Sequence, residues 1–114
     1  MNKWGVVVFY LSFLVIFYVV MILNVKMHEQ VHVENCKHIC GNNATMKVNY
    51  LTVSGRTEGC VCSEDDWANL NLADSFNEAI GYNVDSLILS IFVVGIMVCS
   101  VFLIILWKQC YYEF

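Results

Sequence analysis

The sequence contains no proline and only six glycines, and charged residues make up 14% of its 114 residues. Proline breaks helices because it lacks a backbone N–H donor, so its absence leaves long helices uninterrupted. The low charge and a hydrophobic share of 59% exclude an ordinary soluble domain. A glycine-rich phosphate-binding loop is also missing, and the net charge of −4 argues against nucleic acid as a partner.

Two uncharged apolar segments account for this composition. Residues 4–23 form a run of 20 and residues 87–107 a run of 21, each close to the ~20 residues that cross a bilayer. We therefore expect a mainly α membrane protein, with transmembrane helices over residues 4–25 and 86–107 that form a hairpin. The first segment could instead be a cleaved signal peptide, but no A-x-A-like site follows it before Lys26, which favours an anchor.

Residues 26–85 are then an extramembrane α+β domain that begins as an extension of the first helix. This helix is predicted to run without a break from Gly5 to Cys40, because only Gly41 supplies a stop signal. It leaves the bilayer near Val25.

Further along, the pattern predicts a small β-hairpin and a short helix. Residues 46–53 are rich in Val, Tyr, Thr and Leu and are expected to form a strand, with turn residues at 54–59 and a returning strand at 60–62. Ser63 is a predicted N-cap, because three acidic residues follow it. An amphipathic helix is expected from there, with an end or a kink at Gly81.

Signals for orientation lie at the ends of the spans and in the loop. Lys3 and Trp4 precede the first span and Trp107 and Lys108 follow the second, which suits cytoplasmic termini. The loop contains an acceptor sequon at Asn43, and its four cysteines suit two disulfides in an oxidising compartment. The four cysteines are Cys36, Cys40, Cys60 and Cys62. They allow three disulfide pairings, and a structural zinc site is the competing interpretation. We expect an extracytoplasmic loop.

The most informative motif lies where the first helix leaves the membrane. His28 and His32 are four residues apart, so both imidazoles project from one helical face and can bind a single zinc ion. Glu29 lies beside them, where its carboxylate can act on a water molecule at the metal. This His-Glu-x-x-His pattern resembles the zincin metallopeptidases.

The third zinc ligand is expected from the later helix. Asn77 followed by Glu78 is similar to the Asn-Glu pair of the gluzincin branch, and this resemblance implies Glu78 as the ligand. Thermolysin-like enzymes place Ser-Asp three and four residues after this Glu, where this chain has Gly81 and Tyr82, so the supporting carboxylate is expected from elsewhere, with Asp74 as the candidate. The site-two proteases, which also carry the motif on a membrane helix, take an Asp from a later helix. That resemblance makes Asp85 the runner-up, although Ser86 here replaces the Gly that follows their Asp. Candidates for stabilising an oxyanion, by chemistry alone, are Tyr82, His38 and Arg56.

The sequence thus predicts a membrane-anchored zinc metallopeptidase that cleaves a peptide or membrane-protein substrate near the membrane surface, with Glu29 as the general base. Two alternatives stay open: a non-catalytic two-span membrane protein with a disulfide- or zinc-stabilised binding loop, and an accessory subunit of a membrane complex. Small residues in the second span offer a surface for oligomerisation, and these are Ser86, Ser90, Gly95 and Cys99.

Overall fold

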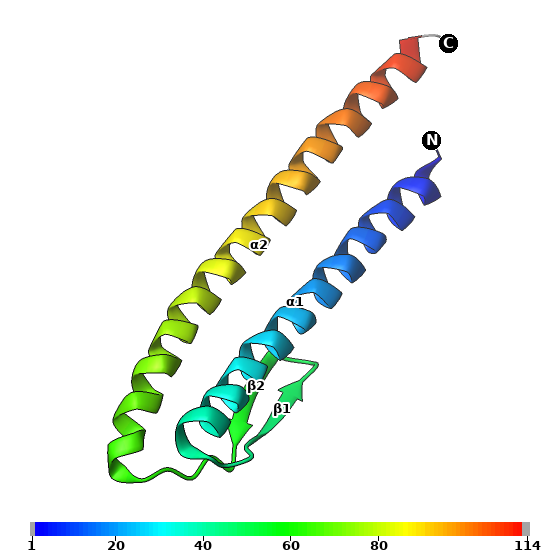
Figure 1. Cartoon of the computed structure of the whole chain (residues 1–114). Helices are drawn as coiled ribbons and strands as arrows, with labels where there is room; N and C mark the ends of the chain where they lie inside the picture. Colours follow the sequence, from blue (N-terminus) through cyan, green and yellow to red (C-terminus); the bar gives the residue numbers. More distant parts are fainter. Residues whose placement is uncertain (1, 113–114) are drawn as a thin grey trace.

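The computed structural model of the chain describes residues 2–112, in the order α1 (Lys3–Cys40), β1 (Thr45–Asn49), β2 (Ser54–Glu58) and α2 (Glu64–Tyr112). Figure 1 shows α1 and α2 side by side, with both ends of the chain at the same end of the molecule. The molecule is elongated, with principal extents of 75 × 21 × 17 Å. The predicted mainly helical architecture with a small antiparallel sheet is confirmed.

Both helices begin and end at the residues that local chemistry favours. The Asn2 side chain accepts a hydrogen bond from the Gly5 backbone N–H at 2.8 Å, and α1 stops at Gly41, whose φ of 69° is the left-handed conformation typical of a helix end. At the start of α2, the Ser63 hydroxyl accepts from the Asp66 backbone N–H at 3.3 Å. The expected end or kink at Gly81 is wrong, because α2 continues through it as one helix of 49 residues. An interior glycine costs a helix only ~1 kcal/mol.

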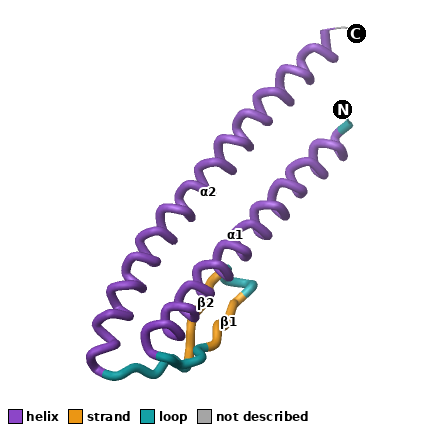
Figure 2. The backbone as a smooth tube through the Cα atoms, viewed as in Figure 1, coloured by secondary structure: helices purple, strands orange, loops and turns teal. Residues whose placement is uncertain are grey.

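The β-hairpin is present, but its strands are shifted from the predicted positions. β1 ends at Asn49 and β2 begins opposite it at Ser54, so residues 54–58, expected as a turn, form the returning strand. The reason is local: the Asn49 side chain accepts hydrogen bonds from the N–H groups of Leu51 and Thr52, at 3.0 and 3.3 Å, and closes the turn early. The sheet lies against the second half of α1 (Figure 2).

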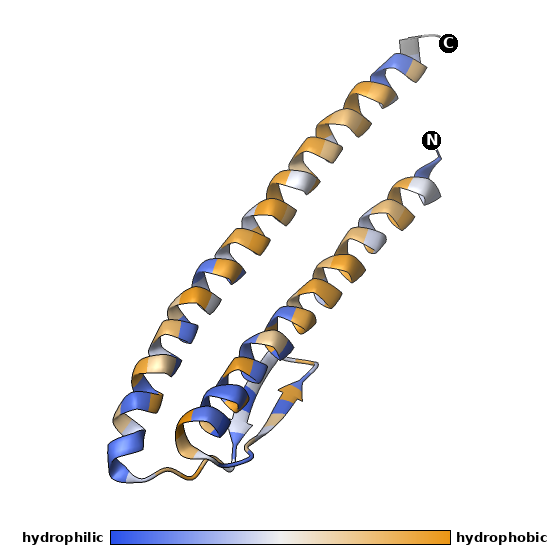
Figure 3. Cartoon of the chain, viewed as in Figure 1, coloured by the Kyte–Doolittle hydropathy of each residue, from blue (hydrophilic) through white to orange (hydrophobic). Residues whose placement is uncertain are grey.

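Both helices consist mostly of hydrophobic residues towards the chain ends, whereas hydrophilic residues gather in the parts near the β-hairpin (Figure 3). Within residues 2–112 both helices are long and apolar enough to cross a membrane. Phe92 of α2 packs edge-on against Phe17 of α1, with ring centroids 5.0 Å apart. Further towards the ends, the hydroxyls of Tyr10 and Ser100 lie 2.6 Å apart. Gly95, expected in an oligomer surface, faces Phe13 of the same chain.

The part of the molecule around the hairpin has a small core. In the described chain, the buried apolar residues are Ile22, Cys36, Ala44 and Leu70. Two disulfides, Cys36–Cys60 and Cys40–Cys62, fasten the segment after β2 to the end of α1. The predicted disulfides are thus confirmed, and the structure selects one of the three pairings. Such cross-links compensate for a core too small to hold a fold alone.

Candidate metal centre

Polar side chains of α1 and α2 face each other just beyond the apolar part of the two helices. Because the helices run in opposite directions, residues one turn apart on α1 meet residues one turn apart on α2. The facing side chains, ordered from the apolar end outward, are Asn24, His28, His32 and Asn35 on α1, and Asp85, Glu78, Asn77 and Asp74 on α2.

Three acceptor atoms converge at the centre of this face. The Nε2 atoms of His28 and His32 lie 3.2 Å apart, and Glu78 Oε1 lies 3.3 Å from the first and 3.0 Å from the second. Zinc bonds of ~2.0–2.1 Å at a tetrahedral angle put two ligand atoms about 3.3 Å apart. These distances fit a zinc ion that the three residues would hold, and a bound water or substrate would supply the fourth ligand. The three residues come from both helices, so the centre also joins α1 to α2.

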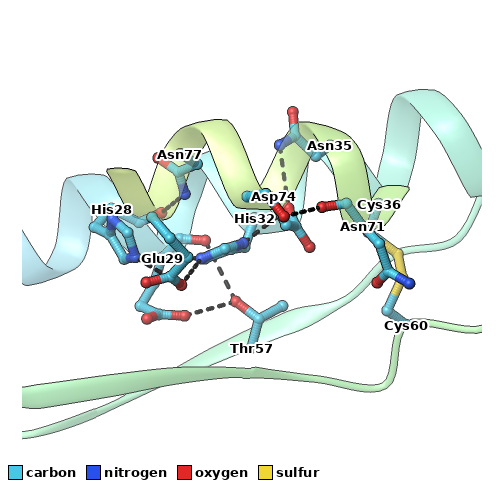
Figure 4. A network of polar contacts seen from close by, with 12 residues as sticks. His28, Glu29, His32, Asn35, Cys36, Thr57, Cys60, Asn71, Asp74 and Asn77 are labelled. Carbon is cyan, nitrogen blue, oxygen red and sulfur yellow. Dashed lines mark hydrogen bonds and ion pairs between the residues drawn. A yellow bond between two sulfur atoms is a disulfide. The ribbon is translucent and has the colours of Figure 1, made fainter. Parts of the chain in front are cut away.

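A second carboxylate orients His32. Asp74 Oδ1 lies 2.8 Å from His32 Nδ1 and also accepts from the Asn35 side-chain amide at 3.2 Å. A proton on Nδ1 held by Asp74 leaves the lone pair of Nε2 directed at the centre, as in the carboxylate–histidine–zinc arrangement. Figure 4 shows Asp74 and His32 in this relation.

The electrostatic surroundings of His32 favour positive charge. Burial alone lowers the pKa of its imidazole, but the hydrogen bond and charge of Asp74, the charge of Glu29 and the hydrogen bond to Glu78 outweigh this effect. The net result is a pKa above the ordinary value of 6.5. A proton and a metal ion compete for the same nitrogen, so these carboxylates favour either cation.

His28 is positioned by two residues of α2. The Asn77 side-chain amide is buried and donates to the His28 carbonyl oxygen at 3.2 Å, which fixes the α1 backbone at this turn. Gly81 lies against the ring: a Cβ atom there would lie 2.6 Å from His28 Nδ1. Glycine at position 81 thus permits the close approach of α2 to the imidazole, and it does not end the helix.

Glu29 lies on the side of α1 that faces the hairpin. Its side chain is buried, and one carboxylate oxygen accepts a hydrogen bond from the Thr57 hydroxyl of β2 at 2.8 Å (Figure 4). Its carboxylate lies within 4.8 Å of the ligand atoms of His28 and His32. Gly55 permits this packing, because a Cβ atom at that position would come within 2.6 Å of Glu29 Cγ.

A cavity of about 420 Å³ opens beside the centre, between α1, β2 and the start of α2. Its α1 wall holds Glu29 and His32, and β2 contributes consecutive residues from Gly55 to Thr57. Trp67 and Leu70 of α2 form an apolar part of the wall. β2 pairs with β1 along one edge, and within the described chain no strand pairs with its second edge.

The other predicted site residues lie apart from the centre. Asp85 is held at the level of Asn24, whose side-chain amide donates to it, and so the structure brings Glu78 and not Asp85 to the imidazoles. Tyr82 and His38 are largely exposed on the helices, and only Arg56 of the three oxyanion candidates lines the cavity. Asn43 is exposed, as a glycan acceptor requires.

Sequence reasoning did not single out Thr57, Gly55 or Gly81 as site residues. Thr57 and Gly55 stand in a segment expected as a turn, and nothing in their spacing relates them to Glu29. Gly81 carried a signal, an isolated glycine inside a helical pattern, which also marks a close approach of another group.

Comparisons of the chain with protein-family models, with characterised proteins and with solved structures returned no match. The function is therefore argued from the site alone.

Proposed function

We propose that the chain is a membrane-anchored zinc metallopeptidase whose metal ligands are His28, His32 and Glu78. The observation that carries this proposal is the convergence of three ligand atoms, from two helices, at mutual distances of 3.0 to 3.3 Å. Two histidines one turn apart occur by chance in helices, and here a carboxylate from the other helix also lies at the distance that tetrahedral zinc ligands have from one another. Asp74 completes the site as the hydrogen-bond partner of His32.

The chain's own residues supply the remaining parts of a hydrolytic site. When bound, zinc would polarise the substrate carbonyl and make the attacking water more acidic. Glu29 takes the proton of this water as its oxygen attacks the carbonyl carbon, and then passes the proton to the nitrogen as the C–N bond breaks. Thr57 holds one oxygen of Glu29, which leaves the second oxygen for this transfer.

The substrate is proposed to be an extended polypeptide segment close to the membrane. The cavity beside the centre is bounded by the apolar side chains of Trp67 and Leu70 and by β2, which has a strand partner on one edge only. We propose that the substrate segment pairs with the other edge. An extended segment in this position passes the metal ligands and Glu29. This arrangement supports a peptide substrate better than a small compact one.

We further propose that α1 and α2 cross the bilayer as an antiparallel pair, with both termini cytoplasmic. The hairpin domain, residues 26–85, which contains the β-hairpin, would then lie outside the cytoplasm. The apolar parts of both helices expose their side chains in the chain alone, which suits a lipid environment. Two disulfides in the domain suit an oxidising compartment.

Metal content and peptide cleavage by the purified chain in liposomes test the catalytic proposal. We expect one zinc per chain, loss of zinc in His28→Ala and His32→Ala, and retained zinc without cleavage in Glu29→Gln. His38→Ala is the matched control, because His38 lies on the same helix, 77% exposed and away from the centre. The probe is a mixture of peptides from a tryptic proteome digest, with new termini identified by mass spectrometry. Bound zinc without cleavage would favour a zinc-stabilised binding loop. Absence of both zinc and cleavage would favour an accessory subunit.

A further inference from the structure

The tip of the β-hairpin, residues 50–53, lies beside a part of α1 that belongs to the apolar span. The Tyr18 hydroxyl donates a hydrogen bond to the Tyr50 carbonyl oxygen at 2.8 Å. Tyr18 precedes Val25, where the helix was expected to leave the bilayer, by seven residues, or about 10 Å at 1.5 Å per residue. Side chains on a helix lean towards its N-terminus, so the Tyr18 hydroxyl lies at least as deep in the proposed span as the Tyr18 Cα atom. The hairpin therefore points back into the membrane.

The side chains of the tip suit lipid and not water. Leu51 is 96% exposed in the chain alone, and Tyr50 next to it is half exposed. Val53 adopts a φ of 52°, a left-handed conformation that strains a β-branched residue and that glycine or asparagine adopts readily. An apolar residue at this position is explained by a requirement for apolar surface.

Several polar groups of the tip have partners inside the protein, which lowers the cost of placing the loop in contact with lipid. The Asn49 side chain accepts from the N–H groups of Leu51 and Thr52, and the Tyr18 hydroxyl serves the Tyr50 carbonyl. The Thr52 hydroxyl pairs with that of Ser54 at 2.7 Å.

The tip also carries the residues that mark a membrane interface. The Lys26 ammonium lies 5.3 Å from the centre of the Tyr50 ring. Lysine and tyrosine together are typical of the boundary between head groups and acyl chains, because each has an apolar body and a polar end. Tyr50 therefore suits a position at this boundary.

We propose that residues 50–53 form a lipid-inserting loop that enters the interfacial layer of the same bilayer that α1 and α2 cross. The partner is phospholipid, contacted by the side chains of Tyr50, Leu51 and Val53. The inserted tip fixes β2, and with it the candidate metal centre, at a constant height above the lipid. The proposal rests on the membrane hairpin of the proposed function, but not on zinc or on catalysis.

Spin labels in phosphatidylcholine liposomes test the depth of the tip. Cys99 and Cys110 are the free cysteines of the described chain, and replacing both by Ser leaves a single added cysteine as the labelled site. The label is placed at Leu51→Cys, at Met46→Cys on β1 as the water control, and at Val94→Cys in α2 as the lipid control. Collision rates with oxygen, which concentrates in lipid, and with a water-soluble nickel chelate are then compared.

The oxygen-to-nickel ratio is expected to be several-fold higher at Leu51 than at Met46, and of the order seen at Val94. Tyr18→Phe should lower the ratio at Leu51 without changing it at Val94, because the freed Tyr50 carbonyl then needs water. A ratio at Leu51 equal to that at Met46, with Val94 still lipid-like, overturns the lipid-inserting loop alone. A water-like ratio at Val94 overturns the membrane hairpin as well, and neither result depends on zinc content.

Discussion

Replacing Gly81 by alanine tests the candidate metal centre without touching a ligand. A Cβ atom at position 81 would lie 2.6 Å from His28 Nδ1 and 2.7 Å from His28 Cε1. Ordinary contacts of this kind begin at about 3.4 Å, so the imidazole must move by about 0.8 Å. Zinc sites tolerate deviations of about 0.2 Å in their bond lengths. We therefore expect Gly81→Ala to weaken zinc binding by about 10- to 100-fold or more. This is the loss typical of mutating a residue that positions a metal ligand.

The same substitution stabilises the helix itself, so a loss of zinc binding can be distinguished from a loss of helix stability. Alanine stabilises a helix interior by about 1 kcal/mol relative to glycine, so helicity should not fall. Gly95→Ala is the matched control on the same helix, because its Cβ would lie 3.6 Å from Phe13, an ordinary contact. Zinc affinity is measured by competition with a chromophoric chelator and helicity by circular dichroism. Equal affinities of Gly81→Ala, Gly95→Ala and the natural chain would refute the placement of His28 at the centre.

Four further predictions follow from the contacts of the site. Asp74→Asn should reduce zinc affinity 10- to 100-fold in chelator competition, because His32 loses its charged partner, and unchanged affinity would contradict that role. Zinc affinity should fall as the pH is lowered through the raised pKa of His32, since protons then occupy the ligand nitrogen. In the metal-free chain the raised pKa of His32 should stabilise the fold fully below pH 6.5, and this stabilisation should be lost as the pH rises through the raised pKa. Urea titrations at several pH values measure this change. Replacing Cys36 and Cys60 together by serine should destabilise the hairpin domain by about 2–4 kcal/mol, seen as faster proteolysis of the loop in liposomes. Thr57→Val should lower kcat for peptide cleavage with zinc content unchanged, and Thr57→Ser should restore it; equal rates in both variants would remove Thr57 from the site.

Patterns along the chain predicted its helices well. The run from Gly5 to Cys40 lacks any strong break, and Gly41 supplies the left-handed residue that ends it, so α1 was expected almost to the residue. Ser63 likewise marks the start of α2. These signals are local, because a cap acts on backbone groups within one turn. The spacing of His28 and His32 is a local signal too, since the helix alone brings both side chains to one face.

Local patterns failed where two signals of similar strength competed. Residues 54–58 contain Ser, Gly, Arg, Thr and Glu, which indicate a turn, yet they form β2. The Asx turn closed by Asn49 and the packing of Gly55 against Glu29 decide the register, and the second of these is a contact between residues 26 positions apart. Gly81 was interpreted as a helix end because its neighbour, His28 of α1, is distant in the sequence.

The sequence by itself determined two long apolar helices, the pair of imidazoles on one face of the first, and a loop with four cysteines and a short sheet. Only the tertiary structure decided that Glu78 and not Asp85 meets the imidazoles, that the disulfides join Cys36 to Cys60 and Cys40 to Cys62, and that the hairpin tip returns to the level of Tyr18. Periodicity fixes which residues share a face of one helix, but the longitudinal offset between two antiparallel helices depends on the packing of both, and a shift of one turn would exchange one carboxylate for another.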